Sequence, residues 1–156
     1  MTRRIAALLL VLALGAALLP ANLAGVDVRI LRNLEEALPQ TGRPILLVFF
    51  STDCPSCYDD LFEARYAVEK GGWPVSVVGV YSGPRDELQA FLEKHACALP
   101  VVLDRRKVLF RRFDVDSLPY KALLSGGTTL YRDDPYKELS RRMEDLKTCL
   151  RKIYSR

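Results

Sequence analysis

The sequence predicts an α/β fold in which helices cover a mixed sheet. Apolar, β-branched runs alternate with stretches of helical periodicity through most of the chain, which is typical of strands joined by helices. Near the C-terminus, Gly126-Gly127 separates two short apolar segments and indicates a β-hairpin. The 156 residues are enough for one domain with a hydrophobic core.

The most informative stretch joins a strand, a Cys-x-x-Cys motif and a helix. Residues 45–50 form a continuous apolar run, as expected of a strand buried on both faces, and Cys54-Pro55-Ser56-Cys57 follows. After the motif, apolar positions recur along one helical face: Cys57, Leu61, Ala64 and Val68. Pro55 suits a first helical turn, because its missing N–H has no partner there anyway. Cys54 is therefore expected at a helix N-terminus.

This placement favours thiol–disulfide chemistry at the two cysteines. Unpaired backbone N–H groups and the helix dipole stabilise a thiolate, and Cys-x-x-Cys thiols can titrate at about 3.5–7.5. Cys57 lies one turn after Cys54, close enough for a disulfide. A structural zinc site would need two more ligands in a second paired motif, and His95, Cys97 and Cys149 are scattered. We therefore predict a redox site with no metal and no cofactor.

The other elements are predicted from the same patterns. Residues 25–42 suggest a short strand and a brief helix, and 104–113 suggest a basic helix or turn. The remaining predicted strands are 75–81, 99–103, 121–124 and 128–131. Helices are expected at 84–96 and after Asp134-Pro135, which should cap the last one.

Residues 1–24 are predicted to be a signal peptide or an N-terminal membrane anchor, and 25–156 the folded domain. Arg3 and Arg4 precede an uninterrupted apolar stretch, and small residues at 20–24 could serve a signal peptidase. We favour the anchor, because the apolar stretch nears spanning length if it continues to Ala24. The domain should then lie in the periplasm or outside the inner membrane, where disulfides persist.

The charge of the chain argues against a nucleic-acid partner. The formal net charge is +4, but Arg3 and Arg4 supply two of those charges and residues 5–24 carry none. The domain is thus close to neutral, without the strong basic balance of a nucleic-acid-binding protein.

The residues 45–50, the motif at 54–57 and Leu118-Pro119 before the hairpin resemble the thioredoxin superfamily. The extra strand–helix unit at 75–96 and the run at 99–104 resemble its TlpA-like, membrane-anchored extracytoplasmic branch, and the likeness covers about residues 26–154. The resemblance implies a three-layer α/β/α sandwich. It also implies that Pro119 is a cis-proline that packs against the cysteine pair and binds an extended substrate segment.

Three positions depart from thioredoxin. Val48 stands where thioredoxins have a buried Asp, and Asp53 where they have a Trp. Asp60 occupies a position where some cytochrome-maturation relatives have a Glu, so it is the candidate proton acceptor for Cys57. Asp53 should disfavour the Cys54 thiolate and raise its pKa, which suits a reductant.

The predicted function is thiol–disulfide exchange, with reduction of protein disulfides favoured over their formation. Expected partners are a protein thiol or disulfide substrate, a membrane electron donor or acceptor protein, and the membrane itself. Two alternatives remain: a copper(I) metallochaperone using the two thiolates, and a binding module with a structural disulfide. Cys97 and Cys149 could either pair or remain free thiols.

Overall fold

The computed structural model describes residues 29–37 and 42–155. Its strands are β1 (Ile30–Leu31), β2 (Ile45–Phe49), β3 (Ser76–Tyr81), β4 (Val101–Leu103), β5 (Tyr120–Ser125) and β6 (Thr128–Arg132). Its helices are η1 (Glu35–Ala37, a single 3₁₀ turn), α2 (Pro55–Gly71), α3 (Arg85–Lys94), α4 (Val108–Phe113) and α5 (Leu139–Tyr154). The predicted signal peptide or anchor, residues 1–24, lies outside the described residues. Within the described ranges, none of the helices combines the length and the apolar character needed to cross a membrane.

The strands form one mixed sheet in the order β1-β4-β3-β2-β5-β6. The pairs β1/β4, β4/β3 and β3/β2 are parallel, and β2/β5 and β5/β6 are antiparallel. The parallel half arises because helices connect its strands, whereas the turn at Gly126 and Gly127, both with positive φ, closes the hairpin β5–β6. The predicted mixed sheet is confirmed.

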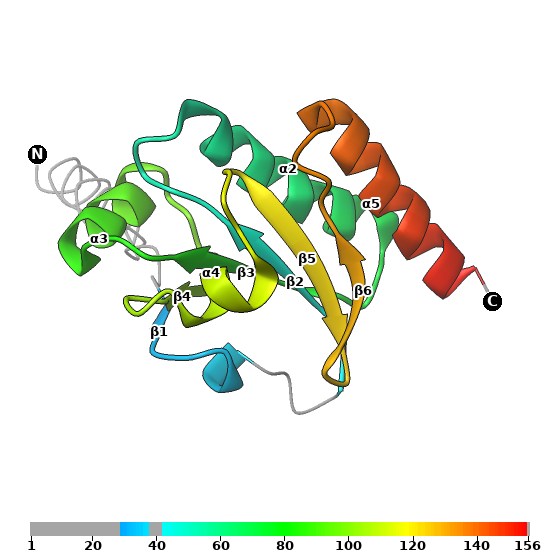
Figure 1. Cartoon of the computed structure of the whole chain (residues 1–156), viewed down its shortest axis with the longest axis horizontal. Coiled ribbons are helices and arrows are strands. Elements are labelled where there is room, and N and C mark those ends of the chain that lie inside the picture. The colour runs from blue at the N-terminus through cyan, green and yellow to red at the C-terminus, as the bar shows by residue number, and fades with distance from the viewer. Residues whose placement is uncertain (1–28, 38–41, 156) are drawn as a thin grey trace, which may run out of the picture.

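Helices cover both faces of the sheet, which makes the predicted three-layer α/β/α sandwich (Figure 1). On one face, alternate residues of β2 such as Leu46 and Val48 pack against apolar residues of α2, α3 and α5. On the other face, Leu47 and Phe49 pack against α4. Phe49 meets Phe110 of α4 edge to face, with ring centroids 5.1 Å apart. Among the described residues, the second face is covered by shorter helices, since α4 has six residues and η1 has three.

The starts of α2 and α3 agree with the sequence predictions, α4 begins at Val108 within the predicted range 104–113, and the start of α5 differs. The backbone before α5 is a turn, in which Tyr136 donates its N–H to Asp134 Oδ1 at 3.0 Å. The helix begins at Leu139 with Glu138 as its N-cap, so the prediction that Asp134-Pro135 caps it is wrong. The Asp134 side chain stabilises the preceding turn instead, which is the other common role of an Asp before a helix.

Candidate active site

The cysteine pair lies where β2 leads into α2. Cys54 is the N-cap residue in an extended conformation, and Pro55 begins the helix, as the sequence predicted. Cys54 and Cys57 form a disulfide with their Cα atoms 5.3 Å apart. Cys57 is fully buried, whereas Cys54 is partly exposed and its Sγ lies 3.6 Å from Ser56 Oγ. The pair therefore offers one sulfur to a substrate and shields the other.

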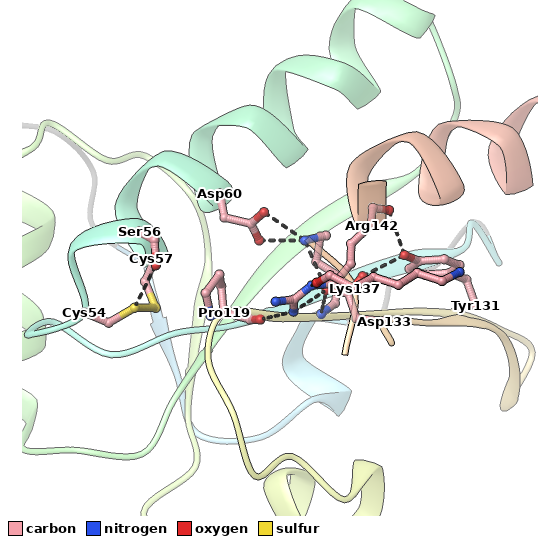
Figure 2. A network of polar contacts seen from close by, with 10 residues as sticks. Cys54, Ser56, Cys57, Asp60, Pro119, Tyr131, Asp133, Lys137 and Arg142 are labelled. Carbon is pink, nitrogen blue, oxygen red and sulfur yellow. Dashed lines mark hydrogen bonds and ion pairs between the residues drawn. A yellow bond between two sulfur atoms is a disulfide. The ribbon is translucent and has the colours of Figure 1, made fainter. Parts of the chain in front are cut away.

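Pro119 lies next to this disulfide (Figure 2). The Leu118–Pro119 peptide bond is cis, which confirms the expectation from the family resemblance. Tyr120, the first residue of β5, pairs with Phe49 at the end of β2, so the register brings the proline to the end of the sheet where the motif begins. Leu118, the residue before Pro119, is half-buried.

Asp60 lies one turn after Cys57 on the buried side of α2. Its carboxylate accepts two hydrogen bonds from the Lys121 ammonium, with distances of 2.8 Å to Oδ1 and 2.7 Å to Oδ2. Both side chains are almost completely buried. Burial raises the pKa of Asp60 above its ordinary value, although the Lys121 charge acts in the opposite direction. A carboxyl group with a raised pKa can hold or release a proton closer to neutral pH than an ordinary aspartate.

Lys121 belongs to a buried network of charged side chains that was not predicted from the sequence. Its ammonium also lies 3.1 Å from Asp133 Oδ2, and its backbone N–H donates to the same carboxylate at 2.9 Å. Asp133 is in turn 3.7 Å from Nη1 of Arg142 on α5. Two acids and two cations thus alternate in the protein interior, which is the arrangement that buried charges require.

Arg142 connects this network to the cis-proline. Its Nη1 donates a hydrogen bond to the Pro119 carbonyl at 2.9 Å, and its Nε donates to the Lys137 carbonyl at 3.0 Å (Figure 2). The guanidinium therefore joins α5 to the segment that leads into β5.

The sequence contained a sign that Lys121 and Arg142 would be buried. Lys121 interrupts an apolar strand, and Arg142 follows Leu139 by three residues and precedes Leu146 by four, on the buried helical face.

Asp53 precedes the motif on the exposed side. Its carboxylate accepts a hydrogen bond from the Ser51 hydroxyl, and this bond lowers the pKa of Asp53 below its ordinary value. The side chain is thus ionised at neutral pH, next in sequence to Cys54. Asp53 and Leu118 also line a groove of about 490 Å³ that continues past Tyr81 and Glu87. Neither cysteine lines the groove, which begins at Asp53, the residue before Cys54.

The two remaining cysteines stay apart from this site. Cys97 is buried and Cys149 is half-buried, and neither forms a disulfide. Burial raises the pKa of both thiols, which makes them poor nucleophiles at neutral pH. His95, which the sequence analysis weighed as a ligand, packs against Tyr58 with ring centroids 4.3 Å apart.

Fold and site together define a thioredoxin-like protein with a Cys-x-x-Cys centre for thiol–disulfide exchange. The model of the AhpC/TSA family matches residues 30–129, so the chain belongs to that family. The match runs from β1 to the first two residues of β6 and includes both cysteines and Pro119. No curated protein sequence matches the chain.

Solved structures with the same fold come from several bacteria. StoA from Bacillus subtilis is 20% identical with a TM-score of 0.56, and the match covers 69% of this chain and 82% of StoA. A secreted Mycobacterium tuberculosis disulfide oxidoreductase, described as homologous to E. coli DsbE, is 20% identical with a TM-score of 0.54, over 70% and 81% of the two chains. The exposed lipoprotein thioredoxin of Streptococcus pneumoniae is 20% identical with a TM-score of 0.56, over 69% and 85%. At this identity the likeness establishes the thioredoxin-like fold.

Proposed function

We propose that the protein reduces disulfides of other proteins outside the cytoplasm. The observation that carries the proposal is the asymmetry of the cysteine pair, with Cys54 partly exposed at a helix N-terminus and Cys57 fully buried behind it. This is the arrangement needed for one sulfur to attack a substrate and the other to resolve the product. The ionised Asp53 beside Cys54 favours reduction, because a nearby negative charge destabilises the thiolate that strong oxidants stabilise.

The reaction starts from the reduced cysteine pair. The Cys54 thiolate attacks one sulfur of the substrate disulfide, forms a mixed disulfide and releases the other substrate sulfur as a thiolate. Cys57 loses its proton and attacks Cys54 Sγ, which releases the second substrate sulfur and leaves the Cys54–Cys57 disulfide. Two electrons pass to the substrate, and a dithiol donor must return them before the next cycle.

Asp60 and Pro119 support these two steps. Asp60, with its raised pKa and its place one turn after Cys57, is the proposed acceptor of the Cys57 proton. Pro119 lies beside the disulfide, where an extended substrate segment would pass, and we assign it to substrate binding. The Lys121 ammonium would stabilise the ionised state of Asp60 before the proton arrives.

The location outside the cytoplasm has two independent supports. The apolar N-terminal sequence after Arg3 and Arg4 is typical of an export or anchor segment. Similar structures include a secreted oxidoreductase and an exposed lipoprotein. A membrane protein that passes electrons across the bilayer would be a suitable donor for a domain in that place.

The test is reduction of insulin disulfides by the full chain, with a dithiol as electron donor. Cys54→Ser should abolish turnover, and Cys57→Ser should accumulate a mixed disulfide through Cys54. The matched control is the Cys97→Ser/Cys149→Ser variant, which should retain activity because neither thiol takes part. Full activity in both motif variants would refute the assignment of the site, and a reduction potential as high as that of a strong oxidant would reverse the direction.

A further inference from the structure

A large cavity opens on the face of the sheet opposite α2. It measures about 860 Å³, which lies within the roughly 300–1,000 Å³ that small-molecule sites occupy. Its floor is apolar and comes from β1, β2, β4, α4 and β5: Leu31, Ile45, Val102, Leu109 and Leu124. Of the described residues, only η1 and the six-residue α4 supply helix on this face.

Arginines surround the apolar floor. Six of them line the cavity, and they come from four separate parts of the chain: Arg32, Arg43, Arg85, Arg105, Arg106 and Arg112. Within the part of the chain that the structure describes, no carboxylate lies within ion-pair distance of any of these six side chains. A guanidinium presents several N–H donors in a planar fork that suits carboxylate, sulfonate and phosphate oxygens.

The acidic side chains at the cavity do not neutralise this charge. Asp104 is buried and caps α4, accepting N–H bonds from Val108 and Leu109 at 2.8 Å and from Phe110 at 3.1 Å. Glu35 is exposed and is the other acid among the lining residues. Six cations and two acids line the cavity, so positive charge is in excess there, and three backbone N–H groups already bind the Asp104 carboxylate.

We propose that this cavity binds a free amphiphilic anion, a single-chain carboxylate of the fatty-acid type. The apolar body would lie on the floor formed by β1, β4 and α4, and the anionic head would meet the arginines. Apolar contact supplies affinity in proportion to the area that leaves water, and the charge-assisted hydrogen bonds fix the orientation of the head. The site lies across the sheet from the cysteine pair and does not depend on the proposed reductase activity.

Octanoate is a suitable probe, and equilibrium dialysis of the radiolabelled anion measures its binding. The full chain is held in bilayer discs of neutral phosphatidylcholine, with empty discs as the blank. We expect one saturable octanoate site per chain. Octan-1-ol has the same apolar body without the charge, and it should bind at least about tenfold more weakly than octanoate. Acetate, which has the charge without the body, should not compete. Equal binding of octanoate and octan-1-ol, or uptake that does not saturate, would overturn the proposal.

Exposed side chains allow variants that keep the fold. Arg105→Gln/Arg106→Gln removes two charges from the cavity, and Val108→Asp places an acid at its edge. Both should weaken octanoate binding by about tenfold. The matched control, Arg141→Gln/Arg151→Gln, removes two exposed charges from α5 and should leave binding unchanged. If octanoate binding weakens equally in the control variant, the effect comes from the net charge of the protein, and the proposed site is wrong.

A second set of discs distinguishes the source of the anion. Discs that contain phosphatidylglycerol present an anionic headgroup at the membrane surface. A cavity that takes a free single-chain anion should bind octanoate with the same stoichiometry in both kinds of disc. Loss of the octanoate site in the phosphatidylglycerol discs would overturn the proposal of a free anion. It would show that an anionic lipid headgroup occupies the cavity instead.

Discussion

The Lys121 ammonium of β5 lies 2.7 Å from Oδ2 of Asp60 on α2, and both side chains are buried. Lys121 stands directly opposite Val48 in the antiparallel pair of β2 and β5. Val48 is the position that holds a buried Asp in thioredoxins. This chain therefore has a buried carboxylate one turn after Cys57, but supplies it from α2 and balances it with a cation from β5, opposite Val48.

The first prediction concerns the stability that depends on Lys121. Lys121→Met keeps a long side chain but leaves Asp60 and Asp133 buried without their shared cation. We expect the free energy of unfolding to fall by about 3–5 kcal/mol, as for other broken buried ion pairs. Urea unfolding at neutral pH measures the change. Lys152→Met, which alters an exposed position on α5, is the control and should cost less than about 0.5 kcal/mol. If the free energy of unfolding falls by a similar amount in both variants, the buried ion pairs of Lys121 do not stabilise the fold as proposed.

The second prediction concerns pH and Asp60. Because burial raises the Asp60 pKa, the folded state binds the Asp60 proton more tightly than the unfolded chain does. The contribution of Asp60 to the free energy of unfolding is therefore greatest below about pH 3.8, and it declines as the pH rises through the folded-state pKa. Asp60→Asn lacks this titration. The free energy of unfolding of the wild type, relative to Asp60→Asn, should fall as the pH rises from about 4 and then level off. A rise over that range would show that the Lys121 charge outweighs burial.

The same variant tests the proposed catalytic role of Asp60. Asn cannot accept the Cys57 proton, so resolution of the mixed disulfide should slow while the first attack by Cys54 continues. Rapid-quench trapping of the intermediate should show more mixed disulfide in Asp60→Asn than in the wild type. If the mixed disulfide accumulates to the same level in both proteins, Asp60 has only a structural role, as the partner of Lys121.

The sequence was sufficient for the sheet, the cysteine motif and its helix, because these depend on local patterns. The run at 45–50 and the apolar positions from Cys57 to Val68 each indicate one element, and the structure has both. The charge network could not be derived in this way. Asp60, Lys121 and Asp133 meet only after three elements pack, and sequence spacing contains no measure of that distance. The start of α5 was misjudged because an Asp-Pro pair can stabilise a turn as well as cap a helix.

The fourth prediction concerns the hydrogen bond between Arg142 and the Pro119 carbonyl. Arg142→Lys keeps a positive charge near Asp133. Its single nitrogen cannot replace the two separate guanidinium nitrogens, Nη1 and Nε, that donate to the Pro119 and Lys137 carbonyls. We expect the segment before β5 to be held less firmly, so that KM for the protein substrate rises several-fold while kcat changes little. The cost in stability should be about 1.5–3 kcal/mol, as for a lost hydrogen bond to a charged group. Arg141→Lys, at the exposed neighbouring position, is the control. Equal changes in kcat and kcat/KM would contradict a role in substrate positioning.

The last prediction concerns the direction of electron flow and rests on Asp53. Asp53→Asn removes a negative charge beside Cys54, and the Asn side-chain oxygen can still accept the Ser51 hydrogen bond. Without that charge the Cys54 thiolate is easier to form, so the reduced state is stabilised and the pair becomes a better oxidant. The reduction potential should rise by about 10–30 mV, since about 30 mV corresponds to a tenfold change in the two-electron equilibrium. Equilibration with glutathione measures the potential, and the rate of alkylation against pH measures the thiolate population. Asp59→Asn, an exposed acid on α2, is the matched control and should change neither quantity. If Asp53→Asn also leaves both unchanged, Asp53 does not set the direction, and the argument for a reductase loses its electrostatic basis.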